Sequence, residues 1–185
     1  MAYSAHFLNA EEYFSDIMVS VDINPFSDNA IMRKIVQVYK DNEPIITLRI
    51  FVATDEYGFI IEQCFNSVLV NDSSIAILYG QHVHLFDIES HKTNSIHLHD
   101  YVGHMYPVPN TASDILSESF IVTTFSYTFL INLNSGIIWQ SQQCAIDGVV
   151  IYDIKDNVIY GSGEWDPPGG WRTFSLSLSN GEFVD

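Results

Sequence analysis

Short apolar runs of strand length, separated by polar turn residues, follow one another along the whole chain. The runs are rich in Val, Ile, Phe, Tyr and Thr, and the breaks are rich in Asn, Asp, Gly and Ser. No window of a dozen residues keeps the 3.6-residue period of an amphipathic helix. We therefore expect a single all-β domain over residues 1–185, with mostly antiparallel strands. The predicted strands are residues 17–23, 31–39, 45–53, 59–65, 75–79, 82–88, 96–101, 120–125, 128–133, 137–142, 149–154, 158–161, 173–178 and 181–184.

One pattern recurs at intervals of 45 residues. Leu-Phe-Asp-Ile-Glu-Ser-His at 85–91 matches Leu-Ile-Asn-Leu-Asn-Ser-Gly at 130–136 and Ser-Leu-Ser-Leu-Ser-Asn-Gly at 175–181. A period of 40–50 residues built from short strands is typical of propeller blades, which stack because one small sheet cannot bury both of its faces. We predict antiparallel meanders in a propeller-like stack of three or four repeats. A β-sandwich is the alternative, and the N-terminal third fits the period poorly.

Six of the seven histidines lie between positions 82 and 104. His82 and His84 are two residues apart, as are His97 and His99, so each pair points to one face of its strand. If residues 90–91 form a two-residue turn, His84 lies opposite His97 and His82 lies opposite His99. Four imidazoles on one face could bind zinc. Since no carboxylate or cysteine accompanies them, we expect that the protein binds no metal.

The chain has 23 Asp and Glu residues but only 7 Lys and Arg, which gives a formal net charge of −16. The acidic residues are not unusually numerous for 185 residues, so the charge reflects a shortage of cations. No Lys or Arg stands between Lys92 and Lys155, and only Arg172 follows. The shortage excludes a nucleic-acid-binding module that neutralises phosphates, and it argues against attachment to anionic membranes. It suits a cationic partner.

The most unusual segment, Gly-Ser-Gly-Glu-Trp-Asp-Pro-Pro-Gly-Gly-Trp-Arg, ends at Arg172. It joins two predicted strands of the last repeat, where the other copies have only a few residues. Two interpretations stay open. The segment either presents Trp165 and Trp171, with Glu164 and Asp166, to a protein or carbohydrate ligand. Alternatively, the two tryptophans close one end of the core, and Arg172 forms an ion pair with Glu164 or Asp166.

Nothing in the sequence predicts catalysis. The motifs G-x-S-x-G, H-E-x-x-H and G-K-[ST] do not occur. Glu164 and Asp166 are neighbours on one loop, a poor geometry for the paired carboxylates of a glycosidase. We expect a binding protein that is not an enzyme and uses no cofactor.

The N-terminus lacks the basic and apolar regions of a secretory signal, and no apolar run reaches the length of a membrane span. Cys64 and Cys144 are too few and too far apart for a disulfide framework, so we interpret them as buried thiols. We expect a cytoplasmic protein.

The segment Gly-Glu-Trp-Asp-Pro-Pro-Gly-Gly-Trp at residues 163–171, within a small acidic chain of repeated hairpins, resembles small bacterial proteins that accompany polymorphic toxins. Among these are the immunity proteins of contact-dependent growth inhibition systems. The resemblance implies a cytosolic inhibitor that binds one toxin domain tightly. Toxins that attack RNA or DNA are commonly basic because their substrate is polyanionic, so an acidic inhibitor attracts them.

We therefore expect a protein that is monomeric until it binds and neutralises a cationic toxin domain, most specifically a nuclease (RNase). The alternatives are a propeller-like interaction module and a carbohydrate-binding protein that uses the loop between Trp165 and Trp171. The candidate contact residues are Glu164, Trp165, Asp166, Trp171, Asp147, Asp153 and Asp156.

Overall fold

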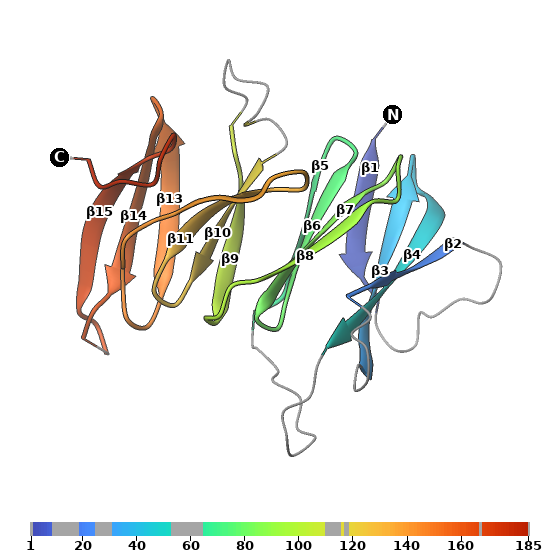
Figure 1. The fold of residues 1–185 in the computed structure, drawn as a ribbon, viewed down its shortest axis with the longest axis horizontal. Coiled ribbons are helices and arrows are strands. Elements are labelled where there is room, and N and C mark those ends of the chain that lie inside the picture. Colours follow the sequence, from blue (N-terminus) through green and yellow to red (C-terminus); the bar gives the residue numbers. More distant parts are fainter. Residues whose placement is uncertain are drawn as a thin grey trace.

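The computed structural model describes residues 2–8, 19–24, 31–52, 65–109, 116, 119–166 and 168–184. The named elements in these residues are fifteen strands, which form four sheets. Figure 1 shows the sheets standing side by side in a row, with the N-terminal sheet at one end and the C-terminal sheet at the other. The all-β prediction is confirmed. The strand predicted at residues 59–65 lies outside the described residues except for Phe65.

The N-terminal sheet has its own topology. Its strand order is β1-β3-β4-β2, and β2 runs parallel to β4. β3 and β4 form a long hairpin through Asp41 and Asn42, which both have positive φ, as a tight hairpin turn requires. This crossed order explains why the 45-residue period does not extend into the first third of the sequence. The strands are β1 (Tyr3–Phe7), β2 (Val19–Ile23), β3 (Ile31–Lys40) and β4 (Glu43–Val52).

The other three sheets are meanders in which each strand pairs with the next one along the chain. After the last strand the chain turns back, and Val184 donates its N–H to the carbonyl of Ser175 at 3.0 Å. The second sheet contains β5 (Ser67–Asn71), β6 (Ser74–Tyr79), β7 (His82–Asp87) and β8 (Thr93–His97). The third sheet contains β9 (Val102–Pro107), β10 (Ser119–Thr124), β11 (Thr128–Asn132) and β12 (Gly136–Gln140). The C-terminal sheet contains β13 (Val149–Lys155), β14 (Val158–Glu164) and β15 (Trp171–Ser177).

The 45-residue repeat corresponds to the turn that follows the third strand of each meander. Each turn opens with a polar residue: Asp87, Asn132 and Ser177. Each reaches a positive φ four residues later, at His91, Gly136 and Gly181. The residue after each opening residue is apolar and buried: Ile88, Leu133 and Leu178. The sequence pattern therefore records a shared turn whose apolar residue is anchored in the core.

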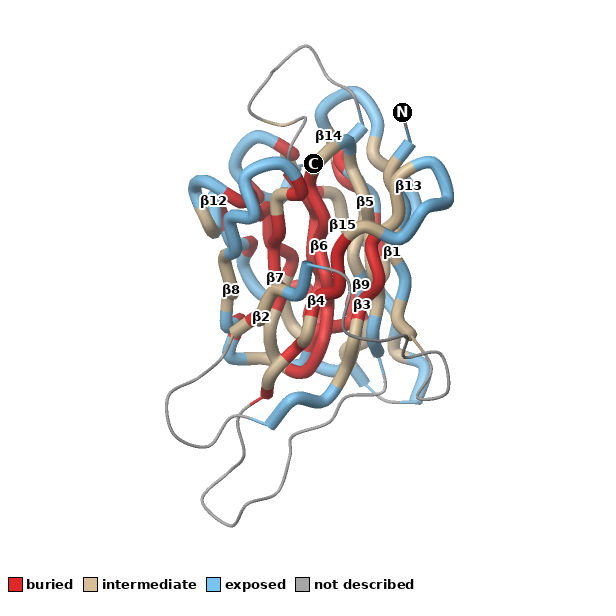
Figure 2. The backbone as a smooth tube through the Cα atoms, turned by 90° about the vertical axis from the view of Figure 1, so that its right-hand side faces the viewer, coloured by how far each residue is buried: buried red, intermediate tan, exposed pale blue. Residues whose placement is uncertain are grey.

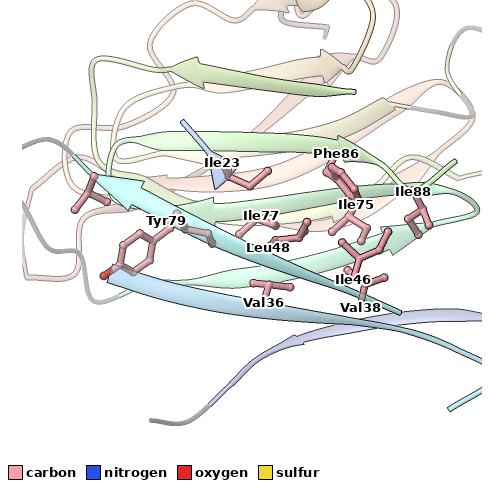
Figure 3. Close-up of a cluster of buried hydrophobic side chains, with 12 residues drawn as sticks. Ile23, Val36, Val38, Ile46, Leu48, Ile75, Ile77, Tyr79, Phe86 and Ile88 are labelled. Atoms are coloured by element: carbon pink, nitrogen blue, oxygen red, sulfur yellow. The ribbon is translucent and has the colours of Figure 1, made fainter. Parts of the chain in front are cut away.

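Three apolar cores fill the spaces between the four sheets. The first core lies between the N-terminal and second sheets and includes Leu48, Ile77 and Phe86 (Figure 3). The second core joins the second sheet to the third and includes Leu85 and Phe120. The third core joins the third sheet to the C-terminal sheet through residues such as Leu130, Ile151 and Leu176. Viewed along the row, the buried backbone occupies the middle and the turns at both ends are exposed (Figure 2).

The two middle sheets are buried on both faces. In β6, Ile75 and Ile77 contribute to the first core, whereas Ala76 and Leu78 contribute to the second. This explains why β6 and β10 read as continuous apolar or small residues, without the polar alternation of a one-sided strand. With four sheets and three cores, the row has more layers than a two-sheet sandwich.

Side-chain hydrogen bonds tie neighbouring sheets together at repeated positions. Asn94 in β8 donates its side-chain N–H to the carbonyl of Leu133 in the next sheet at 3.3 Å. Forty-five residues later, Trp139 in β12 donates its indole N–H to the carbonyl of Leu178 at 2.9 Å. The repeat is therefore a repeat of the contact between sheets as well as of the strands.

Candidate functional site

The face of the C-terminal sheet that points away from the third sheet has no sheet packed on it within the described row. We call it the outer face. Its central cross-strand pair is Tyr160 with Ser175. The pairs at the same position in the second and third sheets are Ala76 with Leu85 and Ile121 with Leu130. Those pairs are fully buried against the next sheet, whereas Tyr160 is 37% exposed.

A second set of equivalent pairs becomes polar one sheet earlier. Leu78 pairs with Val83 in the second sheet, Thr123 with Thr128 in the third, and Ser162 with Thr173 in the C-terminal sheet. Both threonines of the third sheet are fully buried. At these two positions the outer face therefore carries a tyrosine ring and hydroxyl groups where the second sheet carries aliphatic side chains. Such a polar end face is expected at the end of a stack of repeats.

A hollow of about 420 Å³ opens on the outer face. Tyr152, which is 57% exposed, sits at a bulge in β13, where the register with β14 shifts. Its hydroxyl donates to the carbonyl of Gly161 at 2.5 Å, which fixes the ring. The lining residues are Tyr152, Tyr160, Thr173, Phe174, Ser175 and Val184.

The segment with two tryptophans forms a compact hairpin turn between β14 and β15. Trp165 donates its N–H to the carbonyl of Gly170 at 3.1 Å, and Gly170 donates to the carbonyl of Asp166 at 3.0 Å. Gly169, with a φ of 105°, donates its N–H to the Glu164 carboxylate at 2.8 Å. The glycine and acidic residues of the segment therefore hold the turn itself together.

The two tryptophans of this turn have different surroundings. Trp171 is 46% exposed, whereas Trp165 is half-buried beneath the guanidinium of Arg172, which lies 5.8 Å from the ring centroid. Each of the two interpretations of the segment therefore fits one tryptophan. Trp171 is exposed to solvent, whereas Trp165 is partly buried. The contact described for Arg172 is with the indole ring of Trp165, whereas the second interpretation proposed an ion pair with Glu164 or Asp166.

The structure places all seven candidate contact residues on the C-terminal sheet or at its borders, but at two ends. Asp147 donates its N–H to the carbonyl of Glu164 at 3.3 Å, so it joins the end that carries the tryptophan turn. Asp153 is exposed and pairs with Tyr160 across the outer face. Asp156 lies in the turn at the opposite end, 3.9 Å from the Lys155 ammonium. Acidic groups therefore border the outer face at both ends.

The predicted histidine cluster forms, with a different register. His82 pairs with His97, and His84 pairs with Ser95, so the pairing predicted from a two-residue turn is wrong. The turn is longer because Asp87 donates its N–H to the carbonyl of Lys92, beyond the predicted turn. A shift of two residues keeps the rings on one face. The ring centroids of His82 and His84 are 5.6 Å apart, those of His82 and His97 are 4.7 Å apart, and those of His97 and His99 are 4.1 Å apart.

Burial controls the protonation of this histidine cluster. Burial, followed by the charges of His97 and His99, lowers the pKa of His82 to about 4. Burial, followed by the charge of His82, lowers the pKa of His84 to about 3. His84 is 1% exposed; its Nδ1 lies 2.9 Å from the Ser95 hydroxyl, while its Nε2 has no hydrogen-bond partner in the part of the chain that the structure describes.

These histidines are not arranged as metal ligands. The rings of His82 and His84 are stacked with an interplanar angle of 5°. Among the described residues, no group of three or more His, Cys, Asp or Glu side chains could hold a metal ion. The cluster is a group of imidazole rings on the border of the first core, in which burial holds the pKa of His82 and of His84 well below the ordinary value.

Sequence reasoning missed the tyrosines of the outer face. Tyr152 and Tyr160 lie in strands whose pattern resembles that of the other repeats. A usable signal was present, because Ser175 occupies the position of Leu85 and Leu130 in an otherwise matching motif. Cys144 is buried, and burial raises the pKa of its thiol, as expected of an unreactive cysteine. Cys64 lies outside the described residues.

A scan of protein-family models and a search of curated protein sequences found no match to the chain. Within the described residues, no helix has the length and apolar character needed to cross a membrane.

Proposed function

We propose that the protein binds a cationic protein domain through the outer face of the C-terminal sheet. In this proposal the partner is a toxin domain, most specifically a nuclease, which the protein neutralises. This follows the resemblance of residues 163–171 to immunity proteins. The protein is a cytosolic, non-enzymatic inhibitor and is monomeric before it binds.

The replacement of aliphatic pairs by Tyr160 and Ser175 carries the proposal. An end face without a binding role needs only polar side chains to stay soluble. This face instead exposes Tyr152, Tyr160 and Trp171, and tyrosine and tryptophan are enriched at protein interfaces.

Charge selects the kind of partner. Asp147, Asp153 and Asp166 are exposed around the aromatic residues, and Arg172 is already engaged with Trp165. A basic domain would be attracted by these carboxylates over a distance of about 10 Å or less at moderate salt. The aromatic centre would supply contact area and the acidic border would speed association.

The finer form of the fold belongs to this proposal as well. The row is an open, propeller-like stack, in which meanders of about 45 residues play the part of blades. Two observations support it: the shared turn at 45-residue intervals, and the equivalent hydrogen bonds of Asn94 and Trp139 between neighbouring sheets. An open stack leaves the end sheet accessible, which a closed ring would not.

The decisive experiment compares two double charge reversals that change the net charge equally. Asp147→Lys with Asp153→Lys alters the border of the outer face. Glu43→Lys with Glu89→Lys alters exposed carboxylates on other sheets. Association with a panel of purified basic nuclease toxin domains is measured by surface plasmon resonance at several salt concentrations, together with inhibition of nuclease activity.

We expect the first pair to slow association about tenfold or more at low salt, and the second pair to have a much smaller effect. Equal effects of the two pairs would mean that only net charge matters and that the partner does not bind at this face. Absence of binding to any basic domain at every ionic strength would show that the proposed function is wrong.

A further inference from the structure

The hollow on the outer face is large enough to receive a side chain of a binding partner. At about 420 Å³ it lies near the lower end of the range of roughly 300–1,000 Å³ for pockets that hold a small ligand. Its lining residues come from all three strands of the C-terminal sheet and from the segment that returns after β15.

Two tyrosines supply the aromatic wall of the hollow. The Tyr152 hydroxyl is bonded to the carbonyl of Gly161, so the ring is held in place while more than half of the residue stays exposed. Tyr160 projects from the neighbouring strand on the same face. The negative face of an aromatic ring attracts a cation placed over it.

The polar part of the wall offers acceptors for N–H donors. Thr173 and Ser175 contribute hydroxyl groups, and Asp153 stands beside Tyr160 as its cross-strand partner. No residue that lines the hollow in the described part of the chain is positively charged. A cation in the hollow would therefore meet aromatic faces, hydroxyl oxygens and a nearby carboxylate, without a competing positive charge.

We propose that the hollow receives an arginine side chain of the partner, and this rests on the proposed function of the outer face. Arginine fits better than lysine because its planar guanidinium stacks on aromatic rings and presents five N–H donors to several acceptors at once. The same sheet already uses this contact once, where Arg172 lies over Trp165.

A neutral sugar is the main competitor, since sugars also stack on aromatic rings and hydrogen-bond to hydroxyl groups. The acidic border decides between the two, because Asp153 and the surrounding carboxylates favour a cation and add little for an uncharged ring. Charge dependence is therefore the property that the experiment must measure.

The probe is N-acetyl-arginine amide, which carries one side-chain charge and no other. Amide NMR spectra of the full chain are recorded during titration with this compound, with the lysine analogue, with the uncharged citrulline analogue and with glucose. We expect saturable shifts in the millimolar range at Tyr152, Tyr160, Ser175 and Val184 for arginine, weaker shifts for lysine, and none for citrulline or glucose.

Variants locate the site. Tyr160→Ala should weaken arginine binding about threefold or more, whereas Tyr160→Phe, which keeps the ring, should change it less than twofold. Tyr101→Ala is the matched control, because Tyr101, which directly precedes β9, is 44% exposed and does not line the hollow, so its removal should have no effect.

Equal shifts for arginine and citrulline, shifts spread over all carboxylates, or a sugar response at the same residues would overturn the proposal. With a partner in hand, the two proposals separate. If the outer-face charge reversals weaken partner binding and Tyr160→Ala does not, the face binds the partner but the hollow is not the arginine receptor.

Discussion

The outer face of the C-terminal sheet and the buried face of the third sheet use the same strand positions for opposite purposes. In the third sheet the pair of Ile121 and Leu130 is fully buried in the third core. In the C-terminal sheet the equivalent pair is Tyr160 and Ser175, on a face with no sheet beyond it in the described row. Both pairs lie between antiparallel strands, so the two positions differ mainly in their side chains.

The comparison teaches that the end of the row is specified by a small number of positions. A serine at one position of the repeat and a tyrosine opposite it convert a packing face into an accessible one. The following changes test how far these positions account for the difference.

The largest effect is expected where the internal face is given the residue of the outer face. Leu130→Ser removes a fully buried aliphatic side chain and places a hydroxyl in the third core. The free energy of unfolding should fall by about 4 kcal/mol, because a cavity and a buried polar group are created together. Urea denaturation measures the change. A loss below about 1 kcal/mol would mean that the third core does not depend on this pair.

The next largest effect is a loss of stability at low pH, caused by the buried imidazole rings of His82 and His84. Since the pKa of His82 is about 4 and that of His84 about 3 in the folded protein, against 6.5 when unfolded, the unfolded chain binds more protons below pH 6.5. Stability should therefore be complete above about pH 6.5 and fall as the pH is lowered towards 4, by on the order of 3 kcal/mol for fully buried His84 and by a smaller amount for half-buried His82.

Urea denaturation between pH 7 and pH 4 tests this histidine effect. The variant His84→Gln, which cannot titrate, should show a shallower decline than the unmodified protein. An unchanged slope in the variant would assign the acid sensitivity to other groups.

The smallest effect on stability is expected from the reverse exchange. Ser175→Leu gives the outer face the residue of the internal faces, and stability should change by less than about 0.5 kcal/mol because the position borders solvent. Self-association should increase, since a leucine beside Tyr160 enlarges an exposed apolar patch. Sedimentation velocity measures the association, with Ser179→Leu, at an exposed position in the turn that follows β15, as the control. A large loss of stability would show that the outer face is packed against something.

Much of the fold was predictable because its repeat is local. The turn that opens at Asp87, Asn132 and Ser177 depends on a polar opening residue, a buried apolar residue and a positive φ, and all three leave marks within seven residues. The N-terminal sheet was not predictable in this way, because the pairing of β2 with β4 joins segments far apart in sequence and leaves no period.

The candidate site was predictable in composition and less so in geometry. The acidic and tryptophan residues stood out in the sequence, and the structure places them around one sheet. Their division between two ends of that sheet depends on strand register, which the sequence does not show. The predicted register of the histidine strands was wrong by two residues for a similar reason. The backbone N–H of Asp87, at the end of β7, bonds to the carbonyl of Lys92, which makes the turn longer than predicted.

The arrangement of the sheets in a row also determines how binding at one end would change the stability of the other sheets. Each core joins only neighbouring sheets, so stability is close to a sum of nearest-neighbour terms. Among the described residues, the C-terminal sheet is held through one interface, whereas each middle sheet is held through two. A partner seated on the outer face would supply the missing interface and slow amide exchange first in β13–β15, then with decreasing effect towards the N-terminal sheet.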